Sequence, residues 1–157
     1  MSDLRSLMLA IEVATRKRDA ADQALMQARR AVQFAQGQME QLESYAADTE
    51  TRWATANAAT VSAGLMQHHQ HFMQRLRHAI GLQSGVLADV QRQAEAARQH
   101  CVQEEVRLAA FEQLLKKKRA EHARLVARRE QKQMDELATL KYARGAAGGS
   151  PMTGERT

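Results

Sequence analysis

The sequence predicts an all-α protein, a long antiparallel two-helix coiled coil or α-hairpin. Apolar side chains recur at alternating intervals of three and four residues over residues 4–56, and a second such series follows from residue 73. The one interior break lies at residues 57–64, and aromatic residues make up only 4% of the chain, too few for a thick core. A 3.5-residue period held this long favours a coiled coil, because a straight helix would let the stripe drift off its partner.

The first helix is expected from about residue 3 to residue 56. Ser2 and Asp3 suit its N-terminus, because their side-chain oxygens accept hydrogen bonds from free backbone N–H groups. Its apolar stripe, which we call its seam, is rich in alanine, so a partner helix can approach closely. Only Arg18 and Thr49 are polar within it. The seam consists of Leu4, Leu7, Ile11, Ala14, Arg18, Ala21, Leu25, Ala28, Val32, Ala35, Met39, Leu42, Ala46, Thr49, Trp53 and Ala56.

A short connection and a longer second helix follow. Residues 57–64 combine small and β-branched residues with a glycine, and their length suits a link between antiparallel helices. The second helix is expected from about residue 65 to residue 144, and the glycine-rich residues 145–157 are expected to be a disordered tail. The seam of this helix consists of Met73, Leu76, Ile80, Gln83, Leu87, Val90, Ala94, Ala97, Cys101, Glu104, Leu108, Phe111, Leu115, Lys118, His122 and Leu125.

Folding back at the connection fixes which positions face each other. Facing residues should have numbers that sum to about 121–125, since the connection is centred near residue 60. We therefore expect Trp53 to meet Phe72 near the turn, and Leu25 to lie near Ala97 and Cys101. At about 1.5 Å per residue, the first helix ends level with about residue 120, so the last part of the second helix should extend beyond it.

The predicted extension carries the surplus of positive charge. The formal net charge is +5, but residues 1–56 hold seven basic and eight acidic residues. Residues 116–132 hold eight basic and two acidic residues, and Met134, Leu137 and Leu140 follow at intervals of three. A solvated helix face explains the charges as well as a protein partner does. Binding of nucleic acid is disfavoured, because aromatic residues for base stacking and a reading motif are absent from the run.

The sequence contains no motif that points to catalysis, a cofactor or a metal. A two-helix fold offers no deep pocket, and no glycine-rich nucleotide-binding loop occurs. His68, His69, His71 and His78 could offer metal ligands, but solvated polar residues are the better interpretation because further donors are missing. Cys101 lies on the seam, where packing explains it better than reactivity. We predict that the chain is not an enzyme.

The sequence also predicts a cellular compartment. A single cysteine excludes an internal disulfide and fits a reducing environment. Glu12 interrupts the apolar run that ends at Ile11, so a signal peptide is not expected. No apolar run approaches the ~20 residues that a membrane span needs. We expect a cytoplasmic protein without direct membrane insertion, which reaches a membrane only through another protein.

Three segments of the chain resemble a known family: Gln131–Leu137 near the end of the second helix, and Tyr45–Trp53 and His71–Ile80 on either side of the connection. The first of them resembles the signature of the FliJ family, small cytoplasmic proteins of the flagellar type III export apparatus, and the other two resemble the same family with little shift in register. The resemblance extends over residues 1–144.

Family resemblance implies a fold similar to the central stalk subunit of rotary ATPases, with no cofactor. It implies three partners: the hexameric flagellar export ATPase FliI, the cytoplasmic domain of the export gate FlhA, and the chaperones of export substrates. The protein would enter the ATPase ring, promote its activity and couple it to the gate, and it would act as a general chaperone in flagellum biogenesis. It would lie in the cytoplasm and peripherally at the cytoplasmic face of the inner membrane.

Two binding surfaces are also implied by the resemblance. Two positions depart from the family pattern, since Thr49 stands where an aromatic residue is frequent and Gln83 where the family has histidine. The surface that contacts the export gate corresponds to Gln38, Leu42, Tyr45, Phe72, Leu76 and Ala79. The end that contacts the ATPase ring corresponds to Leu4, Leu7, Ile11, Arg119, Arg128, Met134, Asp135, Glu136 and Leu137.

Other functions remain open at the level of the sequence. An equivalent stalk protein of a non-flagellar type III secretion system would have the same features. A coiled-coil scaffold without an ATPase partner, or a nucleic-acid binder that uses the basic extension, is also compatible with the pattern. Stimulation of an export ATPase separates a stalk from a scaffold, and a steep salt dependence of DNA binding would indicate a nucleic-acid binder.

Overall fold

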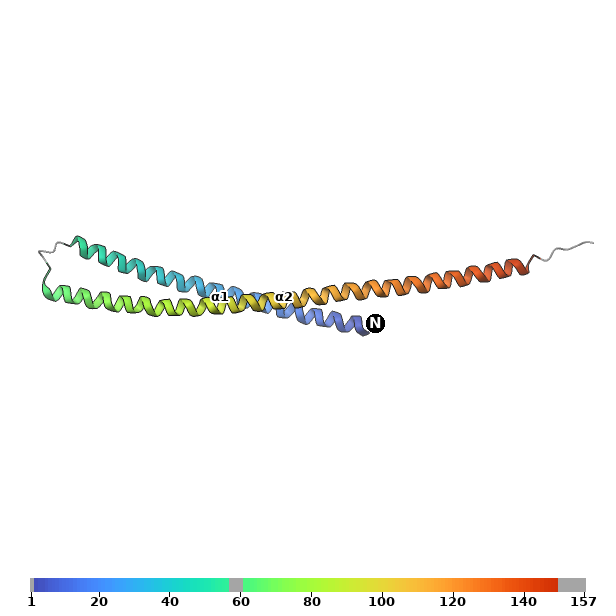
Figure 1. Ribbon diagram of the computed structural model, residues 1–157, viewed down its shortest axis with the longest axis horizontal. Coiled ribbons are helices and arrows are strands. Elements are labelled where there is room, and N and C mark those ends of the chain that lie inside the picture. The colour runs from blue at the N-terminus through green and yellow to red at the C-terminus, as the bar shows by residue number, and fades with distance from the viewer. Residues whose placement is uncertain (1, 57–60, 150–157) are drawn as a thin grey trace, which may run out of the picture. The chain divides into compact units, whose positions relative to one another are not determined.

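The computed structural model describes residues 2–56 and 61–149, which form two long α-helices. Helix α1 spans Ser2–Thr55 and α2 spans Ala63–Ala147 (Figure 1). The two helices pack against each other, and the described residues contain no strand. The predicted all-α hairpin is therefore confirmed.

The two helices contribute residues to two compact units. The hairpin unit is residues 12–109 and contains most of α1 together with the first half of α2. The terminal unit is residues 1–11 and 110–157, of which 2–11 and 110–149 are described. The two surfaces implied by the family resemblance fall in different units.

Side chains near both ends of helix α1 interact with the helix dipole or with backbone carbonyl groups. Asp3 lies in the first turn, where a negative charge offsets the positive end of the helix dipole. Near the other end, the hydroxyl groups of Thr49 and Thr51 donate to carbonyl groups four residues earlier, at 2.7 and 2.9 Å. Such bonds compete with regular helix geometry. A last bond from the Ala56 N–H to the Arg52 carbonyl, 2.9 Å long, closes the helix.

Helix α2 is longer than predicted at both ends. It begins at Ala63 instead of residue 65, because the Ser62 hydroxyl accepts a hydrogen bond from the Leu65 N–H at 3.2 Å and caps the helix. It continues through Ala147 instead of ending at residue 144, since alanine favours helix, and it ends before the paired Gly148 and Gly149. The rest of the predicted tail, residues 150–157, and residues 57–60 of the connection lie outside the described residues.

The predicted seam forms the core of the hairpin unit. Every seam position of α1 from Ala14 to Trp53 is buried or half-buried, and so is every seam position of α2 from Met73 to Leu108. Ala21 keeps only 3% of its surface exposed. Because alanines supply much of this core, its stability depends on close approach of the two helices more than on large side chains.

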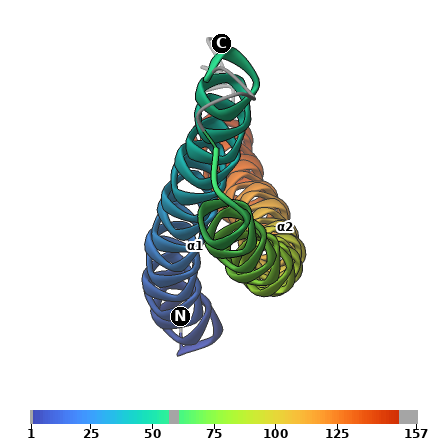
Figure 2. The same ribbon diagram turned by 90° about the vertical axis from the view of Figure 1, so that its left-hand side faces the viewer.

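Contacts between the helices confirm the antiparallel pairing. The Cys101 thiol donates to Asp22 at 3.2 Å, and the Gln83 amide donates to the Ala35 carbonyl at 3.0 Å. The position numbers of these pairs sum to 123 and 118, within about one helical turn of the expected register. Figures 1 and 2 show α1 alongside the first half of α2 in two views.

The predicted contact between Trp53 and Phe72 is wrong. The Trp53 ring stacks on His69, with centroids 4.1 Å apart and an interplanar angle of 4°. Phe72 instead meets Tyr45 edge to face, with centroids 5.9 Å apart. The reason is that His69 continues the seam of α2, whereas Phe72 precedes the seam residue Met73 and lies to one side. His69 is thus a packing residue and not a solvated one.

The seam of α2 ends earlier than predicted. Lys118, His122 and Leu125 are exposed, as is every described residue from Lys116 onward, and Leu115 is the last half-buried position. Within the terminal unit, α1 contributes only residues 2–11, which are too few to cover the remaining turns of α2. The helix therefore continues without burying an apolar face.

One buried carboxyl group interrupts the apolar core. Glu104 is 7% exposed, and its Oε2 atom has no hydrogen-bond partner among the described residues. Burying a carboxylate costs free energy that only good hydrogen bonds and opposite charges offset. The core around Glu104 is therefore less stable than it would be with an apolar residue at this position.

We expect the Cys101 thiol to react slowly with iodoacetamide. Burial raises its pKa, and the hydrogen bond and charge of Asp22 and the charge of Glu105 raise the pKa further, whereas Arg29 lowers it. Since the folded thiol holds its proton more tightly, stability should fall as pH rises through the alkaline range. Asp22→Asn should move the alkylation profile to lower pH, while the exposed control Asp19→Asn should not. Alkylation rates against pH, followed by mass spectrometry, test this, and equal profiles would contradict it.

Candidate functional site

The hairpin unit has two flanks beside the seam. With Val32 of α1 and Met73 of α2 at heptad position a, the seam is formed by positions a and d. In an antiparallel pair, the e positions of both helices lie on one side and the g positions lie on the other. Glu50 and Arg77, at e, form an ion pair of 3.3 Å. We call this side the charged flank and the opposite side the apolar flank.

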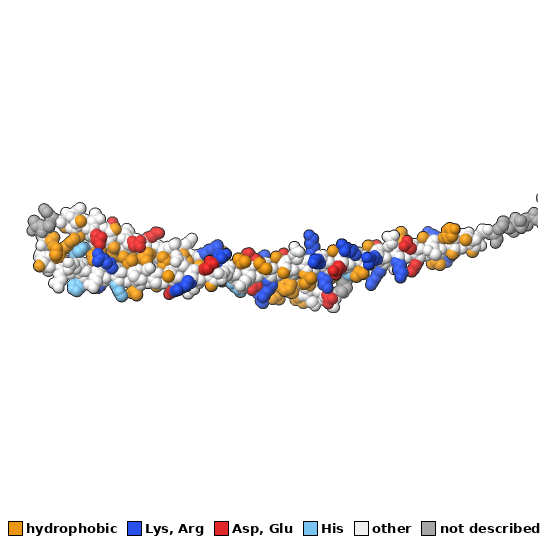
Figure 3. Space-filling model, in the orientation of Figure 1, with side chains coloured by type: hydrophobic (Ala, Val, Ile, Leu, Met, Phe, Trp, Pro, Cys, Tyr) orange, Lys and Arg blue, Asp and Glu red, His pale blue; other side chains and the backbone are white. Residues whose placement is uncertain are grey.

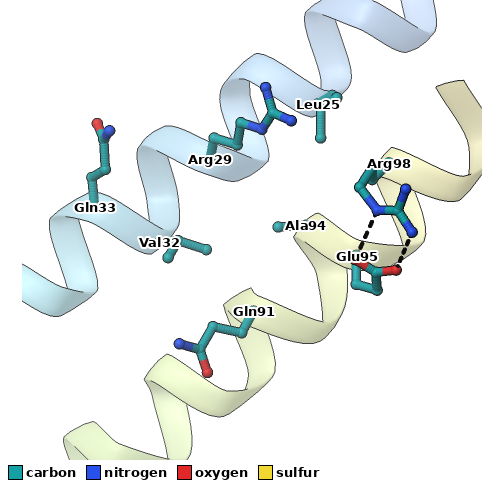
Figure 4. A pocket seen from close by; sticks show the side chains of 8 residues that line it. All are labelled: Leu25, Arg29, Val32, Gln33, Gln91, Ala94, Glu95 and Arg98. Carbon is teal, nitrogen blue, oxygen red and sulfur yellow. Dashed lines mark hydrogen bonds and ion pairs between the residues drawn. The ribbon is translucent and has the colours of Figure 1, made fainter.

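A shallow groove lies on the charged flank (Figure 4). The hydrogen bond from Arg98, 2.8 Å long, and then its positive charge lower the pKa of Glu95, against the opposing effect of burial. Arg29 reaches the same groove from α1, so charged groups border an apolar floor. The groove has a volume of about 330 Å³ and is lined by Leu25, Arg29, Val32, Gln33, Gln91, Ala94, Glu95 and Arg98.

The apolar flank brings together four of the six predicted gate-contact residues. Tyr45 and Phe72 form the edge-to-face pair described above, and Tyr45 is 56% exposed. Gln38 and Ala79 occupy the next pair of g positions along the flank. The Gln83 amide donates to the Gln38 side-chain oxygen at 3.1 Å and holds it there. Gln83, a departure from the family pattern, thus organises this surface.

The other two predicted gate-contact residues belong to the core. Leu76 is 8% exposed, and Leu42 is half-buried. Both lie at seam positions, so their side chains are turned toward the partner helix. They are therefore packing residues of the seam that lies between the two flanks.

In the terminal unit, the predicted contact residues of α1 are also packing residues. Leu7 is 9% exposed, and Leu4 and Ile11 are half-buried. The exposed apolar side chains are Met8 and Leu9, at 49% and 56%. These two residues were not predicted, because only seam positions of α1 were considered as contact residues. Large apolar side chains outside the seam were the signal that could have identified them.

The α2 part of the terminal unit exposes all its predicted contact residues. Figure 3 shows Lys and Arg side chains gathered along it, with apolar side chains nearer the end of the helix. Arg128 and Asp135 line a shallow hollow of about 310 Å³ together with Lys132. Met134 and Leu137 are 69% and 56% exposed. The exposed predicted residues are Arg119, Arg128, Met134, Asp135, Glu136 and Leu137.

The histidines near the turn are the residues whose chemistry best suits a metal ion. Among the described residues, no three or more His, Cys, Asp or Glu side chains lie close enough to hold a metal ion. Neither α1 nor α2, over the part that the structure describes, has a stretch apolar enough and long enough to cross a membrane.

Comparison with known proteins identifies the family. The model of the family described as "FliJ: Flagellar FliJ protein" matches residues 4–147. No curated protein and no solved structure matches the chain. The match takes in both helices, and with them both candidate surfaces. The chain belongs to the FliJ family and is a component of the flagellar protein export apparatus.

Proposed function

We propose that the chain is the stalk of the flagellar export ATPase, which enters the FliI ring with its terminal unit and binds the FlhA cytoplasmic domain with its hairpin unit. The observation that supports this best is the chemical difference between two exposed surfaces in separate units. One surface is aromatic and uncharged, and the other is basic with a thin apolar stripe. Surfaces this different suit two different partners.

Gate binding is assigned to the apolar flank near the turn. Tyr45 and Phe72 form an aromatic pair that is accessible on one side and supported by the seam on the other. Exposed aromatic residues that are held in place by packed neighbours often contribute a large share of the binding free energy of a protein interface. Gln38, held by Gln83, adds a polar group of fixed position beside them.

Contact with the ATPase ring is assigned to the terminal unit. From Lys116 onward, α2 exposes all of its described side chains, and its basic residues suit an acidic or mixed-charge surface. An asymmetric helix within a ring of identical subunits contacts them unequally. Such unequal contacts favour one subunit state over another, and this would promote hydrolysis. The protein would lie at the inner membrane only through its gate contact, and it would hand export substrates and their chaperones to the gate.

Removing either aromatic side chain of the pair should weaken gate binding. Tyr45→Ala or Phe72→Ala is expected to lower affinity for the FlhA cytoplasmic domain about tenfold, because truncation of an aromatic anchor costs more than ~1 kcal/mol. Stimulation of FliI hydrolysis should stay at the wild-type level. Calorimetry and a phosphate-release assay measure the two quantities.

The matched control is Tyr142→Ala, which removes an 81% exposed tyrosine from the terminal unit. This variant should bind the gate domain as the wild type does. Equal loss of gate affinity in all three variants would assign the effect to something other than the Tyr45–Phe72 pair.

A further inference from the structure

The apolar flank extends beyond the residues implied by family resemblance. Phe34 is 69% exposed, Leu82 is 62% exposed and Val86 is 48% exposed. Phe34 and Leu82 occupy c positions, which border the g positions, and Val86 occupies a g position itself. These side chains therefore lie on the same flank as the Tyr45–Phe72 pair and continue it away from the turn.

The part of this flank around Phe34, Leu82 and Val86 is uncharged. The g and c positions of α1 from residue 24 to residue 45, and those of α2 from residue 79 to residue 86, hold no charged side chain. On α1 this uncharged strip is about 30 Å long at 1.5 Å per residue. The opposite flank carries the Glu50–Arg77 ion pair and the Arg98–Glu95 ion pair. The apolar flank is therefore uncharged over these stretches of α1 and α2, and Arg75 and Asp89 border the stretch of α2.

A hollow with negative charge borders the strip. It has a volume of about 540 Å³ and opens over Gly37, where an added Cβ atom would meet nothing within 4 Å. The charged groups of its lining are Glu40 and Asp48, and the ring of Tyr45 forms part of its wall. Carboxylates near an aromatic ring suit a guanidinium or ammonium group, through charge and through cation–π attraction.

We propose that this flank binds an amphipathic helix of the export-gate domain, whose apolar side covers Phe34, Leu82 and Val86 and whose basic residue enters the hollow over Gly37. A third helix lying along two packed helices buries their g and c positions, as in a three-helix bundle. The inference rests on the proposed gate contact and names the kind of segment that makes it.

A second copy of the chain does not fit the same surface. A strip about 30 Å long and about 10 Å wide, one helix diameter, buries roughly 600 Å² over two partners, below the ~1,200 Å² of stable interfaces. A transient contact with a different protein is compatible with an area of this size.

Filling the hollow tests the proposal without weakening the fold. Gly37→Gln places a long uncharged side chain in open space, and it should raise helix stability because glycine disfavours helix. It should nevertheless lower affinity for the gate domain about tenfold, since the basic residue is displaced. Gly81→Gln is the matched control: it also points into open space, but it lies on the charged flank. Unchanged affinity of Gly37→Gln would overturn the proposal.

Truncation of the new side chains separates this inference from the proposed function. Phe34→Ala and Leu82→Ala should each lower gate affinity about fivefold to tenfold. If they bind as the wild type does while Phe72→Ala is weakened, the gate contact stands and the extended docking surface is wrong. If the wild-type chain itself does not bind the gate domain, both are wrong.

The identity of the bound segment is tested by photo-cross-linking. A benzoylphenylalanine placed at position 34 of the full chain, mixed with the gate domain, should cross-link to a helix with an apolar stripe and a Lys or Arg within one turn of it. Cross-links to a loop, to a strand or to a second copy of the chain would overturn the proposal.

Discussion

Ending the chain after Lys118 is expected to abolish stimulation of FliI hydrolysis and to leave affinity for the FlhA domain within about twofold of the wild type. The deletion removes most of the exposed part of α2, including Met134 and Leu137, to which the proposed function assigns the contact with the ring. It leaves the hairpin unit, residues 12–109, complete. The aromatic pair and the seam beneath it are therefore unchanged.

A second deletion controls for the loss of chain length. Ending the chain after Ala147 removes only residues that follow α2 and should preserve stimulation. The rate of phosphate release by FliI, measured at saturating stalk concentration, compares the two deletions. Stimulation by the chain that ends at Lys118 would contradict the role given to the terminal unit.

Ala21→Glu is expected to lower the free energy of unfolding by roughly 3 kcal/mol or more, because a carboxylate would be forced into the core. Ala21 is 3% exposed and adjoins Asp22, which already contacts Cys101 from across the seam. A longer side chain would separate the helices, and its charge would add to that of Asp22.

The neighbouring residue provides the control. Ala20 is exposed, and Ala20→Glu should change stability by less than about 0.5 kcal/mol, since glutamate favours helix nearly as well as alanine. Urea unfolding followed by circular dichroism measures both variants. If Ala21→Glu and Ala20→Glu unfold at the same urea concentration, close packing at the alanine seam does not hold the hairpin unit together.

The fold was predictable because one periodic signal determines it. A 3.5-residue repeat identifies which side of each helix is buried, and the single break identifies where the chain reverses. The start of α2 could also have been read from Ser62, whose hydroxyl caps the helix. Comparing the helix lengths predicted that α1 would end level with about residue 120, but the seam of α2 ends at Leu115, so Lys118, His122 and Leu125 were wrongly placed in it.

The candidate surfaces were harder to predict, because the register of the two helices decides which residues meet on a flank. Periodicity places Trp53 in the seam, but the choice between His69 and Phe72 as its neighbour depends on a shift of less than one helical turn. The meeting of Phe34 with Leu82 and Val86 on one flank requires both the register and the direction of pairing. Leu7 and Leu76 were named as contact residues, although their place in the seam gives them packing roles.

The account is tested most directly by measuring gate affinity and ATPase stimulation on the same two variants, Phe72→Ala and the chain that ends at Lys118. Phe72→Ala should lose gate affinity and keep stimulation, and the deletion should lose stimulation and keep gate affinity. Parallel loss of both activities in either variant would contradict the separation of the two binding surfaces between the hairpin unit and the terminal unit.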